Sequence, residues 1–337
     1  MVLYLVFFSV FNPNIIFVGL VTFVESIINF IIQVFWTKRL LPEYKIKYQY
    51  AKIRAVKELL FSGIWSSISS LGNNLLTGLT IIFVNVLYGA TESGTLSIAN
   101  TLPSLCTTII MMMVNVFYPR LTNRYAENGL KSLEIETINS QKIMGIIICV
   151  PILLLIGLGK EFFLLWMPNE NAAELQTASI IYLIPFVVQA NMWTLTQVFP
   201  VLNQVKKPAI VMLIIGIINV LLCLSLPNII PTNYLLIPII TSVLNVLYCV
   251  IFVPLFVSHL LSCSVKRYYQ HLLKAALASA IVLLLTFQIK SLFICNSWFW
   301  FVLCGLTCAI VSYVAFLVII LDREQLTRLL EYVRKQR

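Results

Sequence analysis

Uncharged polar side chains at helical spacing are the residues of this chain best suited to chemistry. They recur at steps of three and four within two long apolar segments, about residues 59–88 and 94–117. Because an α-helix has about 3.6 residues per turn, each set lies along one side of its helix. A membrane helix turns such a stripe toward other helices or toward water, not toward lipid. The stripes consist of Ser66, Ser70, Asn73, Asn74 and Thr77, and of Ser97, Asn100, Thr101, Ser104, Thr108 and Asn115.

These stripes are open to two interpretations. Any single Asn or Ser can act only as a hydrogen bond between packed helices. Two adjacent helices striped so heavily favour a polar cavity that the helices share. Amides in the middle of other segments, such as Gln189 and Asn191, suit either role because an amide both donates and accepts.

A third stripe, in the segment from about residue 14 to 36, has a carboxylate at its midpoint, Glu25. An ionised carboxylate at mid-bilayer costs on the order of a few kcal/mol, so such an acid is a functional candidate. Three roles stay open for Glu25: a protonated member of its stripe, an ion- or proton-coupling site in a hydrated cavity, or the partner of a basic group on a missing helix. We expect the cavity to be lined by Glu25, Asn29, Asn73, Asn74, Asn100 and Asn191.

No motif points to catalysis, to a cofactor or to a metal. His259 and His271 lie in or beside a connector and lack the helical spacing of metal ligands. The sequence contains no Walker A motif, and the eight cysteines include no C-x-x-C pair and fall mostly in apolar segments, where they act as small hydrophobes. We therefore expect a protein that is not an enzyme and that binds no metal or cofactor.

The elements that must position these side chains are membrane helices. Sixty per cent hydrophobic residues, 11% charged residues and a mean hydropathy of +0.95 exclude a soluble domain. The fold class predicted is an all-α, polytopic transmembrane bundle with about nine full spans, because a span needs about 20 apolar residues, plus a partial helix at residues 1–11. Residues 118–142 are expected to form a polar loop. Residues 143–166 carry no stripe, so we expect this helix to face lipid.

The distribution of basic residues predicts the orientation. If the basic connector at 38–58 is cytoplasmic, alternation of sides places 21 of the 23 lysines and arginines inside, with only Lys160 and Lys290 outside. This bias follows the positive-inside rule and places the C-terminus in the cytoplasm. The net charge of +10 is therefore a signal of membrane topology. Interleaved tyrosines and lysines at 38–58 leave RNA binding as a minor alternative, and we expect no nucleic-acid partner.

Several segments carry a family resemblance. Residues 63–72, the turn at Gly89-Ala90 and residues 116–122 resemble the start of the second lobe of polysaccharide flippases. These are the O-antigen and capsule translocases of the multidrug/oligosaccharidyl-lipid/polysaccharide exporter superfamily. The similarity continues through residues 203–208 and 219–227 and covers most of the chain from 14 to 321.

The resemblance implies a domain organisation. Members of the family have two six-helix lobes that face each other across a central cavity, often followed by two extra helices. About four and a half N-terminal helices of that pattern are absent here, and we expect a truncated gene model rather than a degenerate relic, because Met1 falls in what looks like the middle of a helix. The parts expected are a remnant of the first lobe at 1–37, the basic connector at 38–58, a six-helix lobe at 59–257, two additional helices at 258–321 and an amphipathic cytoplasmic tail at 322–337.

The resemblance also implies a function. A polyprenyl-diphosphate-linked oligosaccharide would move from the inner to the outer leaflet of a bacterial inner membrane by alternating access. Membrane lipids and the polysaccharide polymerase or chain-length machinery are the expected partners. The diphosphate would need cations near the cytoplasmic mouth, although positive-inside decoration explains the same residues. The candidates are Arg54, Lys57, Arg120 and Lys142.

Three alternatives stay open at the level of sequence. A cation-coupled multidrug exporter of the same superfamily would prefer a compact acidic or aromatic pocket. A membrane-embedded polysaccharide polymerase or ligase would carry a large outside loop, whereas the outside loops expected here are short. A non-functional remnant would explain the missing helices.

Overall fold

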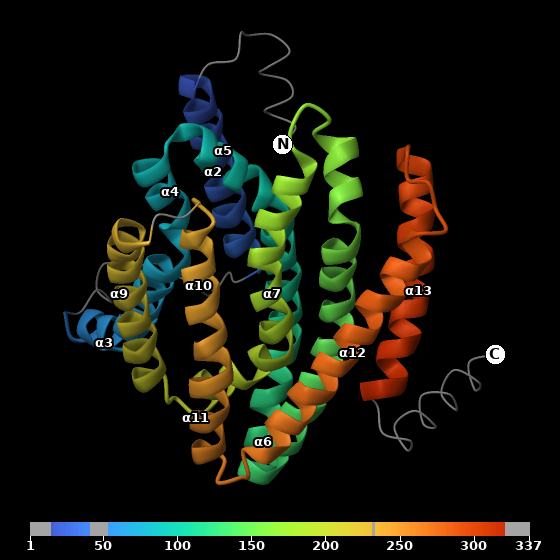
Figure 1. Cartoon of the computed structure of the whole chain (residues 1–337). Helices are drawn as coiled ribbons and strands as arrows, with labels where there is room; N and C mark the ends of the chain where they lie inside the picture. Colours follow the sequence, from blue (N-terminus) through green and yellow to red (C-terminus); the bar gives the residue numbers. More distant parts are fainter. Residues whose placement is uncertain (1–14, 41–52, 231–232, 321–337) are drawn as a thin grey trace. The chain divides into compact units, whose positions relative to one another are not determined.

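The computed structural model describes residues 15–40, 53–230 and 233–320 (Figure 1). The chain divides into two compact units, residues 1–62 and 63–337, and each is considered by itself. The expected partial helix at 1–11, part of the connector at 38–58 and the tail at 322–337 lie outside the described residues. In the described ranges all regular structure is helical, and eight helices are long and apolar enough to cross a membrane. The predicted all-α, polytopic bundle is confirmed.

The first unit contains α2 (Ile15–Leu40), and α3 (Ile53–Asn73) runs from the first unit into the second. The rest of the second unit is a bundle of helices, two of which are short π-helical turns, η2 and η3. Its elements are η2 (Asn74–Gly78), α4 (Thr80–Tyr88), α5 (Ala90–Ala99), α6 (Thr101–Trp166), α7 (Ala172–Thr196), α8 (Val198–Val201), α9 (Lys206–Ile229), α10 (Leu236–Leu247), η3 (Tyr248–Phe252), α11 (Val253–Leu260), α12 (Lys266–Lys290) and α13 (Trp298–Ile320).

Helix α6 is two helices that meet at Gly129. The backbone there has φ 70° and ψ −159°, a conformation that is essentially restricted to glycine. We call residues 101–128 the first arm and residues 130–166 the second arm. Counted this way, the described residues contain nine helices able to span a membrane, the number expected from the sequence.

The predicted polar loop at 118–142 is wrong, because apart from Gly129 these residues are helical. The charged residues there pair with one another between the arms. Arg120 Nε lies 2.5 Å from Glu136 Oε1, and Arg124 Nε lies 3.8 Å from Glu136 Oε2. Glu136 is only 5% exposed. Charge therefore joins the two arms at their connected ends instead of marking an irregular loop.

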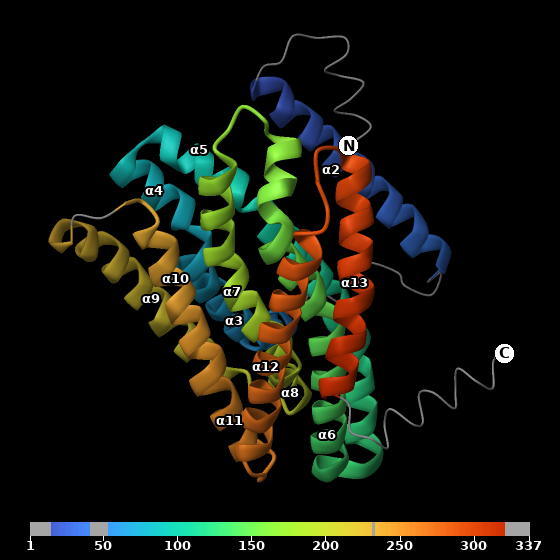
Figure 2. The same cartoon turned by 45° about the vertical axis from the view of Figure 1, so that its right-hand side comes forward.

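The second arm also differs from its prediction. Its residues 143–166 were expected to face lipid, but they lie in the core, and the helix packs against α7, α12 and α13 (Figure 2). Glycines make this close packing possible: a Cβ at Gly157 would lie 2.6 Å from Thr286 Cγ2, and one at Gly159 would overlap Gln176 Oε1. Small residues let membrane helices approach each other where no polar stripe is present.

A second close contact fixes the polar stripe of α3. Helices α3 and α9 cross backbone to backbone, since a Cβ at Gly72 would lie 2.6 Å from the Leu213 nitrogen and one at Gly216 would lie 2.5 Å from the Gly72 oxygen. Just beyond this crossing, a π-helical turn frees backbone carbonyls that need new donors. Asn219 Nδ2 supplies them, donating to the Leu75 and Leu76 oxygens at 3.1 and 3.0 Å.

Candidate functional site

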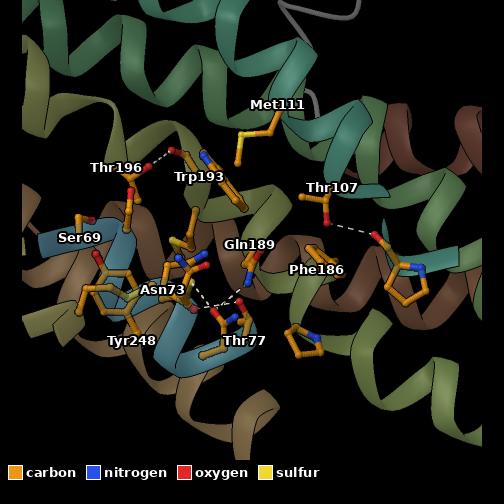
Figure 3. A pocket seen from close by; sticks show the side chains of 18 of the residues that line it. Ser69, Asn73, Thr77, Thr107, Met111, Phe186, Gln189, Trp193, Thr196 and Tyr248 are labelled. Atoms are coloured by element: carbon orange, nitrogen blue, oxygen red, sulfur yellow. Dashed lines mark hydrogen bonds between the residues drawn. The ribbon is translucent and has the colours of Figure 1, made fainter. Parts of the chain in front are cut away.

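The second unit contains a cavity of about 1400 Å³ (Figure 3). Its walls come from α3, η2, α4, the first arm of α6, α7, α8, α9, α10 and η3. Typical small-molecule sites occupy about 300–1,000 Å³, so this cavity has room for a larger molecule. The crossing of α3 with α9 and the hydrogen bonds of Asn219 hold one wall in place.

Amide side chains form the most versatile part of the wall. Asn73 and Asn74 project from the end of α3 and the start of η2, and Asn100 precedes the first arm. In the part of the chain that the structure describes, no hydrogen bond engages these three amides. Deeper in the wall, Gln189 Nε2 donates to Asn245 Oδ1 at 2.8 Å, so that pair is already satisfied. The three asparagines can therefore both donate to and accept from a bound molecule.

Hydroxyl groups supply acceptors instead. Ser104 donates to the Thr101 oxygen at 2.7 Å, and Thr108 donates to the Ser104 oxygen at 3.1 Å. On α7, Thr196 donates to the Trp193 oxygen at 2.7 Å. Each hydroxyl proton is thus used within its own helix, while the oxygen keeps a lone pair for a guest.

Aromatic rings form the rest of the wall, and one of them contacts a lysine. Trp65, Phe186, Trp193 and Tyr248 all line the cavity, and Figure 3 shows the last three among its side chains. Lys206 Nζ lies 5.2 Å from the centroid of the Trp65 ring, at a distance typical of a cation–π contact. Lys206 is not among the cations predicted from the sequence, although the Lys206-Lys207 pair next to an apolar segment was a usable signal.

The predicted cavity residues fall in three places. Asn73, Asn74 and Asn100 line the cavity. Glu25 and Asn29 lie one turn apart on α2 in the first unit, and their role in a cavity stays a prediction.

Asn191 requires a correction. It is 1% exposed and does not line the cavity. Its Nδ2 donates to the Val187 oxygen at 2.8 Å and to Cys149 Sγ at 3.1 Å, so it faces the second arm, on the opposite side of α7 from Gln189. The helical spacing that placed polar residues on α7 did not say which of its two polar faces is hydrated.

The four predicted phosphate contacts belong to both units of the chain. Arg54 and Lys57 lie on the part of α3 in the first unit. Arg120 pairs with Glu136, and Lys142 belongs to the second arm, within electrostatic range of His271. Of the two in the second unit, neither Arg120 nor Lys142 lines the cavity, and the phosphate role of Arg54 and Lys57 stays a prediction. In the described residues no group of three His, Cys, Asp or Glu side chains gathers that could hold a metal ion.

Comparison with known proteins agrees with this picture. Residues 1–124 match the family described as polysaccharide biosynthesis protein. Over 256 residues the chain is 25% identical to EpsK of Bacillus subtilis (strain 168), an uncharacterized membrane protein, and the match covers 76% of this chain and 50% of EpsK. The predicted resemblance to the polysaccharide flippases is confirmed.

A solved structure supports the fold. The lipid II flippase MurJ in its inward closed conformation superposes with a TM-score of 0.54 at 15% identity, over 80% of this chain and 55% of MurJ. At this identity the match concerns the fold alone. The chain spans about half the length of the relatives that it matches. It is a multi-pass membrane protein by its helices and by its relatives.

Proposed function

We propose that this chain forms part of a transporter, not an enzyme, that flips a polyprenyl-diphosphate-linked oligosaccharide from the inner to the outer leaflet of a bacterial inner membrane. The observation that carries the proposal is the cavity of about 1400 Å³ whose wall combines unpaired amides, acceptor hydroxyls and aromatic rings. Sugar hydroxyls donate and accept, and they find both partners in such a wall. Alternating access would expose the cavity to each side of the membrane in turn.

The diphosphate has a candidate partner beside the cavity. Lys206 is exposed, and its neighbours Val205 and Pro208 line the cavity together with the Trp65 ring that it contacts. A phosphate placed there would keep the saccharide inside and leave the lipid tail in the bilayer. This role for Lys206 adds to Arg54, Lys57, Arg120 and Lys142, for which the phosphate role stays a prediction.

Binding by the purified chain tests the proposal. Trp65 and Trp193 lie in the wall, so a bound saccharide should change their fluorescence. We expect saturable binding of a polyprenyl-diphosphate-linked disaccharide, and several-fold weaker binding by an Asn73→Ala/Asn74→Ala variant that melts at the wild-type temperature, since each lost hydrogen bond is worth about 0.5–1.5 kcal/mol. Equal binding by the wild-type protein and the variant would show that the saccharide does not bind in this cavity.

The multidrug exporter is the second candidate, because four methionines line the cavity and can adapt to varied apolar guests. The same fluorescence titration with a hydrophobic cationic dye separates the two functions. Binding of the dye that the lipid-linked disaccharide cannot displace would favour the exporter.

The orientation proposed from the basic residues can be tested with two native cysteines. Cys263 lies between α11 and α12, Cys295 lies between α12 and α13, and both are partly exposed. We propose that Cys263 faces the cytoplasm and Cys295 the outside. An impermeant thiol reagent added to intact cells should then modify Cys295 and not Cys263, and the reverse result would contradict a cytoplasmic C-terminus.

The pH of that labelling matters. Burial, together with the neighbouring Cys304, raises the pKa of the Cys295 thiol to about 11. Only the thiolate reacts, and below the pKa its fraction grows about tenfold per pH unit. The labelling rate of Cys295 should therefore still rise by about that factor between pH 9 and pH 10, where an unshielded thiol with a pKa of about 8.5 is already mostly ionised. A rate that levels off above pH 9 would show that the thiol is not shielded.

A further inference from the structure

The wall of the cavity is uncharged throughout its described part. Every residue that lines it carries a hydroxyl, an amide, an aromatic ring, a sulfur or an aliphatic group. No carboxylate of the described residues lines it, and three of the carboxylates of this unit have partners elsewhere: Glu136 with Arg120, Glu161 with Lys290 at 2.7 Å, and Glu174 with the Tyr234 hydroxyl at 2.7 Å. A guest in the cavity therefore meets dipoles rather than ions.

The direction of the wall's hydrogen bonds adds a second constraint. Threonines on four of its elements donate their protons to backbone carbonyls, as Thr77 does to the Asn73 oxygen at 3.0 Å and Thr107 to the Pro103 oxygen at 3.1 Å. Ser242 donates likewise to the Ile181 oxygen at 2.8 Å. What these hydroxyls offer a guest is an acceptor. A sugar hydroxyl can donate to it, whereas an ionised carboxylate only accepts and has nothing to give.

These two observations separate neutral sugars from acidic ones. A neutral sugar donates to the threonine and serine oxygens and accepts from the asparagine amides. A uronic acid carboxylate would lose part of its hydration and would find no counter-charge in the wall. The asparagine amides could donate to it, but the threonine and serine oxygens whose protons are already used would present only lone pairs to it. Burying a charge without a partner is costly, and each unsatisfied contact adds to that cost.

We propose that the saccharide accepted by this cavity is built of neutral sugars and that saccharides bearing carboxylates are rejected. The inference rests on the proposed function, because it assumes that the cavity holds the saccharide. The charged diphosphate is not rejected in the same way, because its candidate partner, Lys206, lies beside the cavity and is not one of the residues that line it.

A matched pair of ligands tests the proposal. The purified chain is titrated with a polyprenyl-diphosphate-linked diglucose and with the analogue in which the outer glucose is glucuronic acid, and tryptophan fluorescence reports binding. We expect the neutral ligand to bind at least about tenfold more tightly, a difference that corresponds to about 1.4 kcal/mol. Equal or tighter binding of the acid would overturn the inference while leaving the proposed function standing. Binding of neither saccharide beyond that of polyprenyl phosphate would overturn both.

A charge placed in the wall should reverse the preference. Asn73→Lys supplies the missing counter-charge, so it should raise the affinity for the acidic ligand relative to the neutral one. Thr122→Lys is the control, since Thr122 is exposed on the first arm and does not line the cavity. If Asn73→Lys melts early, Thr108→Lys makes the same test from the first arm of α6, which also lines the cavity. An unchanged ratio of affinities in well-folded variants would contradict selection by the wall.

Discussion

The two arms of α6 both carry uncharged polar side chains, yet they use them in opposite ways. On the first arm Ser104, Thr108 and Asn115 are exposed and line the cavity. On the second arm Thr137, Ser140 and Gln141 are fully buried against other helices. Polarity alone therefore does not distinguish a hydrated wall from a packed interface. Whether a polar side chain is hydrated depends on what it faces, and the polar side chains of the second arm face closely packed helices.

The largest effect that would sharpen this contrast comes from enlarging a glycine of the second arm. Gly157→Val should lower the free energy of unfolding by about 1–3 kcal/mol or more, because Thr286 is fully buried and cannot move away. Thermal melting of the purified chain measures this. Gly94→Val is the control, since no atom lies within 4 Å of a Cβ there. Equal melting of the two variants would break the contrast between the arms.

The junction between the arms should give the next largest effect. Glu136→Gln leaves Arg120 and Arg124 without their shared carboxylate, and we expect a loss on the order of 1–3 kcal/mol together with faster hydrogen exchange near Gly129. Glu127→Gln is the matched control, because Glu127 is 60% exposed and its pair with Arg124 should contribute about 0–1 kcal/mol. If both variants behave alike, the buried carboxylate does not hold the arms together.

The smallest change in stability belongs to the first arm. Thr108→Val removes one acceptor from the cavity, so the free energy of unfolding should stay within about 0.5 kcal/mol while saccharide affinity falls by about two- to tenfold. Thr122→Val, outside the cavity, should change neither quantity. A first-arm variant that loses stability without losing affinity would make this arm a packing element like the second.

These contrasts show how far the sequence leads. The fold class, the number of spans and the cavity-lining amides Asn73, Asn74 and Asn100 follow from apolar length and from the period of the polar stripes. Asn191 could not be assigned in this way, because α7 has polar residues on two faces. One face carries Gln189 and meets the cavity, and the other meets the second arm.

The burial of the second arm could not be predicted from the sequence for a related reason. An apolar helix without a stripe can face either lipid or protein, since lipid tails are as apolar as a leucine side chain. The available signal was the set of small residues at 145, 157 and 159, where neighbours approach too closely for a side chain. The charged residues around Gly129 led to a wrong prediction of a loop. In the structure they form ion pairs between the two arms of a helical hairpin.

The contrast between the arms requires that water reaches the first arm and not the second, and thiol labelling tests this most directly. In a chain whose partly exposed Cys263 and Cys295 are replaced by serine, Thr108→Cys and Ser140→Cys place matched thiols on the two arms. We expect a water-soluble thiol reagent to modify Thr108→Cys in the folded protein, the lipid-linked saccharide to protect it, and Ser140→Cys to react only after unfolding. Equal rates at the two positions would contradict the contrast between the arms.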